Sequence, residues 1–135
     1  MENINIRRVD INALRQLQSI GRQTFYETFS AHNSEENIRK YLAEGFSDEQ
    51  LTRELQNPGS EFYFAELEDH VIGYLKLNSG EAQTELKEEG TVEIERIYVS
   101  RDYHGKKVGQ LLYEKAVQVA RDKKAACIWL GVWEQ

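Results

Sequence analysis

The stretch that decides the fold is residues 91–133, TVEIERIYVSRDYHGKKVGQLLYEKAVQVARDKKAACIWLGVW. Apolar and polar side chains alternate over residues 91–100, which is typical of a β-strand, and apolar residues recur at helical spacing from about 108 to 123. A second apolar segment follows at 126–133. A strand, a glycine-containing loop, a helix and a strand form a β-α-β crossover, so we expect the two strands to be parallel neighbours.

The residues before this unit predict a helical half followed by a hairpin. Ile4 and Ile6 favour a first strand, and Asp10 stands at the N-cap of a helix whose apolar residues include Leu14, Leu17, Phe25 and Phe29. Ser34 opens a second helix, and Ser47 with Gln50 forms the capping box of a third. Residues 61–67 and 71–77 form the hairpin. The fold class is therefore α/β, with α+β-like order: a mixed, mainly antiparallel sheet with one β-α-β crossover.

Strict alternation along the strand at 91–100 predicts which side chains share a face. Glu93, Glu95, Ile97 and Val99 are expected on one face, so that the two acids point the same way. The opposite face is then expected to carry Val92, Ile94, Arg96 and Tyr98. In the helical half, we expect Tyr26, Phe29 and Tyr41 to be core residues.

Composition limits the function. The chain has 135 residues, 40% of them apolar, and a formal charge of −6, so we expect one folded domain over residues 1–135 and no nucleic-acid partner. Its short apolar runs and polar start predict neither a membrane partner nor a signal peptide, and a lone Cys127 is typical of a cytoplasmic protein. We expect no metal site, because His32, His70 and His104 are far apart in the sequence.

The loop before the helix at 108–123 is the best candidate for a binding site. Gly105 and Gly109 permit close approach of backbone to a ligand, and a helix N-terminus offers unpaired N–H groups. Lys106 and Lys107 add positive charge beside it. These features favour an anion site, although a plain connecting loop fits the same residues equally well.

Two segments then carry a family resemblance. Residues 93–99, EIERIYV, and 103–112, YHGKKVGQLL, resemble the acetyl-CoA-binding signature of the GNAT superfamily of N-acetyltransferases. The signature is an apolar strand ending in valine, then (Arg/Gln)-x-x-Gly-x-(Gly/Ala), then a helix beginning Leu-Leu. Gly109 matches, whereas His104 and Lys107 replace the usual Arg or Gln and the usual first glycine. Residues 24–29, 94–99 and 128–134 are similar, more narrowly, to bacterial spermidine/spermine N-acetyltransferases.

The resemblance implies an acetyl-CoA-dependent N-acetyltransferase with acetyl-CoA as co-substrate and a small amine, such as a polyamine, as acceptor. Glu93 or Glu95 would accept the proton of the incoming ammonium. Leu130 and Gly131 would border the pantetheine arm. The cofactor-binding residues implied are Ile97, Tyr98, Val99, His104, Gly105, Lys106, Lys107, Val108, Gly109 and Gln110.

The end of the sequence leaves an alternative open. The family fold continues with one more helix, which carries a tyrosine acid in many relatives, and two more strands, so we expect a GNAT domain that stops after its fifth strand. The bare strand edge would then favour a homodimer. The alternative function is a weak or inactive GNAT-like module that binds CoA or a partner chain through this edge.

Overall fold

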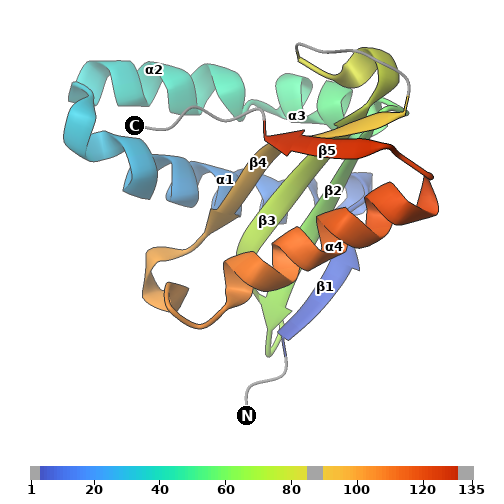
Figure 1. The fold of residues 1–135 in the computed structure, drawn as a ribbon. Helices are drawn as coiled ribbons and strands as arrows, with labels where there is room; N and C mark the ends of the chain where they lie inside the picture. The colour runs from blue at the N-terminus through green and yellow to red at the C-terminus, as the bar shows by residue number, and fades with distance from the viewer. Residues whose placement is uncertain (1–3, 85–89, 131–135) are drawn as a thin grey trace.

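A mixed five-stranded sheet organises the molecule. A computed structural model describes residues 4–84 and 90–130 of the chain. The sheet order follows the sequence, and neighbours are antiparallel except for the parallel pair β4 and β5 (Figure 1). This confirms the expected mixed sheet and its crossover. The strands are β1 (Ile4–Arg8), β2 (Ser60–Leu67), β3 (His70–Ser79), β4 (Thr91–Val99) and β5 (Cys127–Leu130).

Helices cover both faces of the sheet. Figure 1 shows α4 (Val108–Asp122) crossing one face, with the other helices on the opposite face. These are α1 (Leu14–Phe29), α2 (Glu35–Gly45) and α3 (Asp48–Gln56). Short 3-10 turns lie at residues 11–13, 30–32, 80–82 and 101–103. No helix among the described residues has the length and apolarity needed to cross a bilayer.

The predicted serine caps begin two of these helices. Ser34 Oγ accepts a hydrogen bond from Asn37 N, and Ser47 Oγ accepts one from Gln50 N, each at 3.1 Å. The capping box of α3 is closed on this side only, because the Gln50 side chain donates to Glu54 Oε2 at 2.7 Å instead of turning back to Ser47. Gln50 therefore joins a charged cluster that also includes Glu54.

Each face of the sheet has its own apolar core. The core under α4 includes Leu75, Leu77, Val92, Ile94, Val108 and Leu112. The core under α1 and α3 includes Leu17, Leu51, Phe62, Phe64 and Tyr74, with Tyr98 packed against it. Because helices cover both faces, a ligand reaches the sheet at a strand edge or at the end of a strand, such as the C-terminal end of β4.

A β-bulge at Glu95 corrects the expected alternation along β4. Lys76 of β3 pairs with Arg96, and the next residue, Leu77, pairs with Ile94, so that Glu95 is the extra residue. Ile97 therefore packs against the same core as Ile94, and the expectation that Ile94 and Arg96 share a face is wrong. Strict alternation fails because pairing with β3, not the β4 sequence, sets the bulge.

Two expected core aromatics are instead on the surface. Tyr26 is 54% exposed and Tyr41 is 59% exposed. Phe25 occupies the place between α1 and α2, where its ring centroid is 4.7 Å from that of Phe29 and 5.7 Å from that of Tyr41. Phe25 and Tyr26 are neighbours in α1, and two successive residues of a helix point in different directions. Phe25 packs against the core, so Tyr26 points away from it.

Candidate active site

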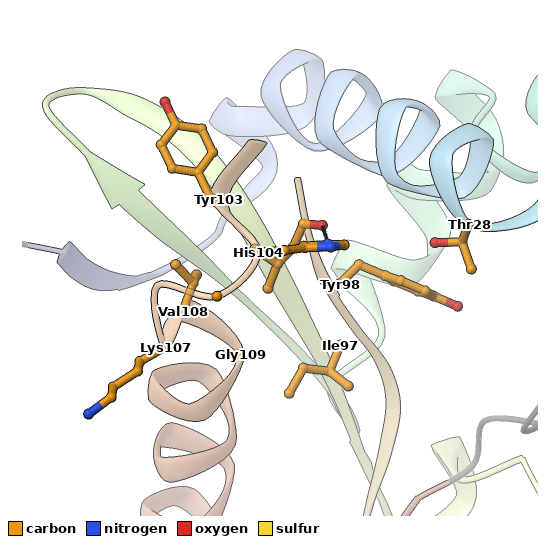
Figure 2. Close-up of a pocket in the computed structure, with 10 residues that line it drawn as sticks. Thr28, Ile97, Tyr98, Tyr103, His104, Lys107, Val108 and Gly109 are labelled. Carbon is orange, nitrogen blue, oxygen red and sulfur yellow. Dashed lines mark hydrogen bonds between the residues drawn. The ribbon is translucent and has the colours of Figure 1, made fainter. Parts of the chain in front are cut away.

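A cavity of about 560 Å³ lies where the C-terminal half of β4 meets the start of α4 (Figure 2). Its wall is formed by the end of β4, the loop that follows and the first turn of α4, with one residue from α1. The lining residues are Thr28, Ile97, Tyr98, Val99, Tyr103, His104, Gly105, Lys107, Val108 and Gly109.

The structure gathers most of the predicted cofactor residues in this cavity. Of that set, Lys106 and Gln110 are not part of the lining, and neither are Glu93 and Glu95, which lie further toward the N-terminus of β4. Gly131 and residues 85–89 lie outside the described residues, as does the end of the expected strand at 126–133.

Sequence reasoning missed Thr28 and Tyr103 as lining residues. Tyr103 directly precedes the loop motif and could have been included on that ground. Thr28 reaches the cavity because α1 is tied to the residues after β4: Glu27 Oε1 accepts a hydrogen bond from Arg101 N at 2.9 Å, and Gln23 Nε2 donates to Ser100 Oγ at 2.8 Å. No local pattern in the sequence predicts this tertiary contact.

The backbone of β4 presents hydrogen-bonding groups to the cavity. Ser100 N donates to Ile72 O at 2.8 Å, so Ser100 and, two residues earlier, Tyr98 turn their backbone groups toward β3. Ile97 and Val99 then turn theirs toward the other edge. Among the described residues, β5 pairs with β4 only at Thr91–Ile94, so this edge has no strand partner beside the cavity. It can therefore pair with an extended ligand such as an amide-containing arm.

The start of α4 supplies donors at the other side of the cavity. The first N–H groups of a helix have no intrahelical acceptor, and α4 has neither a side-chain cap nor an acidic residue in its first turn. Gly105 and Lys107 have positive φ values, 83° and 65°, and these turn the loop so that it leads into the helix. Unpaired N–H groups at the positive end of a helix dipole bind anions such as phosphates.

Lys107 carries backbone strain at the position where the family signature has glycine. Replacing Lys107 with Gly removes the left-handed strain, and we expect the free energy of unfolding to rise by about 1 kcal/mol. Denaturant titration of both proteins measures this change. The control is Lys106→Gly, a neighbouring loop position that does not share the positive φ. Equal effects of the two substitutions would show that strain at Lys107 is not the cause.

His104 closes the loop onto β4. Its Nε2 lies 2.8 Å from Val99 O, and because a carbonyl oxygen only accepts, Nε2 carries the proton (Figure 2). Tyr98 also lines the cavity, and burial raises the pKa of its phenol. The histidine thus performs a structural task that an arginine or glutamine at this position could also perform, since each has an N–H donor.

Glu93 is fully buried, and its carboxylate accepts three hydrogen bonds. Its carboxylate accepts hydrogen bonds from Thr84 N at 2.8 Å, from Thr84 Oγ1 at 2.6 Å and from Asn78 Nδ2 at 3.1 Å, and the residue is 0% exposed. These three donors tie residue 84 to β3 and β4. The arrangement holds Thr84 to the sheet and leaves Glu93 no open path to a substrate.

Glu95 is the accessible member of the pair. Its side chain is 20% exposed, and its carboxylate contacts Lys76 Nζ at 2.8 Å, Asn78 Nδ2 at 2.8 Å and Arg96 Nη2 at 3.3 Å. Burial disfavours ionisation, but the charges of Arg96 and Lys76 and the hydrogen bonds outweigh burial and hold the pKa of Glu95 below its ordinary value. Glu95 is therefore ionised at neutral pH, which is the form that a proton acceptor requires.

Residues in the described parts of the chain form no cluster of three or more His, Cys, Asp or Glu side chains suited to hold a metal ion. The site described above offers backbone donors, an accessible carboxylate and a helix start that suits an anion.

Comparison with known proteins agrees with this arrangement. The model of the acetyltransferase (GNAT) family matches residues 17–135. An uncharacterised N-acetyltransferase of Lactobacillus delbrueckii subsp. lactis is 37% identical over 134 residues, which is 99% of this chain and 78% of the relative. The spermidine N(1)-acetyltransferase of Thermoplasma acidophilum is 27% identical over 125 residues, covering 90% of this chain and 73% of the relative.

A solved structure extends the match to the fold. The PaiA N-acetyltransferase of Thermoplasma acidophilum, crystallised with coenzyme A, superposes with a TM-score of 0.79 at 26% identity, over 93% of this chain and 78% of that chain. An aminoglycoside acetyltransferase from soil metagenomic DNA has the same fold, with a TM-score of 0.73 at 18% identity over 97% of this chain and 78% of the other. The protein belongs to the GNAT acetyltransferase family and is an N-acetyltransferase.

Proposed function

We propose that the protein transfers the acetyl group of acetyl-CoA to a primary amine of a small molecule, with polyamines such as spermidine or spermine as the foremost acceptors. The observation that carries the proposal is the cavity at the junction of β4 and α4, where an unpaired strand edge adjoins a helix start without a side-chain cap. One side of this junction suits an amide-containing arm, and the other suits a pyrophosphate.

The residues present fit acetyl-CoA. The backbone groups of Ile97 and the amide of Val99, whose carbonyl oxygen already accepts from His104, would bind the pantetheine arm, and the amides of Val108, Gly109 and Gln110 would bind the pyrophosphate. The flanking loop, with Gly105 at its turn, would place Lys106 and Lys107 near the phosphates, and His104 and Tyr98 would line the passage between the two sites.

Acetyl-CoA supplies an activated acyl group when bound. Glu95 then accepts a proton from the ammonium of the acceptor, directly or through one water molecule, so that the free amine can attack the thioester carbon. The new N–C bond replaces the C–S bond, and the departing thiolate takes up a proton from solvent or from a nearby acid. Glu93 holds residue 84 and Asn78 in place and does not touch the acceptor.

Charge and similarity support a polycationic acceptor. The chain has a formal charge of −6, which attracts polyamines over long distances. A Thermoplasma relative of 27% identity is a spermidine N(1)-acetyltransferase. Both observations favour spermidine over an uncharged or anionic acceptor.

Thiol release from acetyl-CoA, measured against a panel of amines, tests the proposal. The panel contains spermidine, an aminoglycoside and a peptide with a free N-terminal alanine, and mass spectrometry identifies the acetylated product. We expect the highest kcat/KM with spermidine. Faster transfer to the peptide or the aminoglycoside would overturn the polyamine assignment, and CoA binding without transfer to any amine would favour the non-catalytic alternative.

A further inference from the structure

Four charged side chains meet on the helical face of the sheet, and one of them comes from α3. Glu54 Oε1 lies 3.0 Å from Lys76 Nζ and 3.0 Å from Arg96 Nη1. The same two cations contact Glu95, at 2.8 Å and 3.3 Å. Lys76 and Arg96 therefore each bridge the two carboxylates, and we call these four residues the charge quartet.

The quartet is largely shielded from water. The side chain of Lys76 is 8% exposed and that of Glu54 is 11% exposed, while Glu95 and Arg96 are each 20% exposed. The Lys76 ammonium lies 5.6 Å from the ring centre of Phe62. Shielded charges act on one another more strongly than surface charges do, so the balance of the quartet affects what can approach Glu95.

With Glu54 ionised, the quartet is neutral. Burial disfavours ionisation of Glu54, but the charges of Arg96 and Lys76 outweigh burial and hold its pKa below the ordinary value. Two carboxylates then balance two cations. Without the charge of Glu54, one uncompensated positive charge would remain beside Glu95, where the proposed acceptor arrives as an ammonium.

We propose that Glu54 is a positioning residue for acetyl transfer, which neutralises Lys76 and Arg96 so that a cationic amine can reach Glu95. This inference rests on the proposed function. It assigns to α3 a part in acceptor selection, although α3 contributes no residue to the cavity at the start of α4. Acceptors with a positive charge are the class that depends on Glu54.

A purely structural role for Glu54 is the competing explanation, and the chain offers a matched control. Glu61 on β2 is also 11% exposed, and its carboxylate accepts a hydrogen bond from Tyr63 Oη at 2.6 Å and pairs with Lys123 Nζ at 2.9 Å. Tyr63 belongs to the core under α4, on the face opposite the quartet. Replacing Glu61 with Gln therefore removes a comparable shielded carboxylate away from the proposed acceptor path.

The test compares Glu54→Gln, Glu61→Gln and the double variant Glu54→Gln/Lys76→Gln, with spermidine as acceptor. In Glu54→Gln we expect KM for spermidine to rise about 10-fold or more, with CoA affinity unchanged, because an added positive charge repels the ammonium. The double variant restores the neutral balance, and we expect its KM to return most of the way to that of the parent. Glu61→Gln should leave KM unchanged.

Each outcome separates the inference from the function on which it rests. A Glu54→Gln variant with the parent's KM, or a double variant no better than Glu54→Gln, would overturn the charge-balance role. If Glu54→Gln does not fold, the double variant and the single variant Lys76→Gln still test the inference. In Lys76→Gln the quartet carries a net negative charge, so the inference predicts a KM for spermidine below that of the parent. Full activity of Glu95→Gln would instead overturn the proposed base, and this inference with it.

Discussion

Replacing Glu95 with Gln should lower the rate of acetyl transfer by about 100-fold or more, because the amide keeps the shape of the side chain but cannot accept the ammonium proton. CoA affinity should be unchanged, since Glu95 lies outside the cavity at the start of α4. Steady-state kinetics give the rate, and calorimetry with CoA gives the affinity.

Glu93→Gln is the matched control, because it stands on the same strand and accepts its hydrogen bonds from Thr84 and Asn78. We expect its main effect on stability, since an amide cannot accept from all three donors that the carboxylate satisfies. If Glu93→Gln loses the activity and Glu95→Gln keeps it, the roles of the two acids are reversed.

The pH dependence follows from the depressed pKa of Glu95. In the folded protein the pKa of Glu95 lies below its ordinary value of 4.5. Glu95 therefore remains mostly ionised down to about pH 4.5 and becomes protonated only at lower pH. The stability that its contacts contribute is likewise complete above about pH 4.5 and is lost as pH falls through the folded pKa. Protonation of Glu95 should therefore not lower the rate between pH 8 and 5. Any fall in rate over this range should come from protonation of the acceptor amine.

Gly109→Val should weaken acetyl-CoA binding by at least about 10-fold, because a branched side chain at the first turn of α4 crowds the phosphates that the helix start is proposed to hold. The protein itself has room for the first added atom: a Cβ on Gly109 would have its nearest neighbour, Val99 Cγ2, at 3.8 Å. The fold should therefore survive, which circular dichroism and thermal melting verify.

Gly45→Val is the control for the effect that a valine within a helix has on the stability of the protein. Gly45 lies in α2, and a Cβ there would meet nothing within 4 Å. We expect this variant to bind acetyl-CoA as the parent does. Equal affinity of Gly109→Val and the parent would mean that Gly109 serves only the turn into α4 and that the phosphates lie elsewhere.

The elements of the fold follow from local signals in the sequence. Ser34 and Ser47 begin helices because a serine oxygen can take a free N–H of the first turn, and this requires no tertiary contact. The β-α-β unit is equally local, since a crossover between parallel neighbours has one favoured hand and order. The resemblance in residues 103–112 then identified most of the cavity lining.

What the sequence could not predict depends on pairing and packing between distant segments. The bulge at Glu95 arises from the register with β3, and it brings Glu95 and Arg96 together on the helical face. The difference between Glu93 and Glu95 has the same origin, because Thr84 encloses one carboxylate and leaves the other partly exposed. The alternation of side chains along the strand predicted the same face for Glu93 and Glu95 and so could not distinguish their roles.

The most direct test of the proposed site is residue-resolved hydrogen exchange with and without saturating acetyl-CoA. Amides that have no acceptor among residues 4–84 and 90–130 should gain protection, namely those of Ile97, Val99, Val108, Gly109 and Gln110. Arg96 and Tyr98, whose backbone groups turn toward β3, should exchange as before. This pattern of alternating protection along β4, continued into the first turn of α4, is the result we predict. Identical exchange at all of these amides in both states, or protection confined to another part of the molecule, would contradict it.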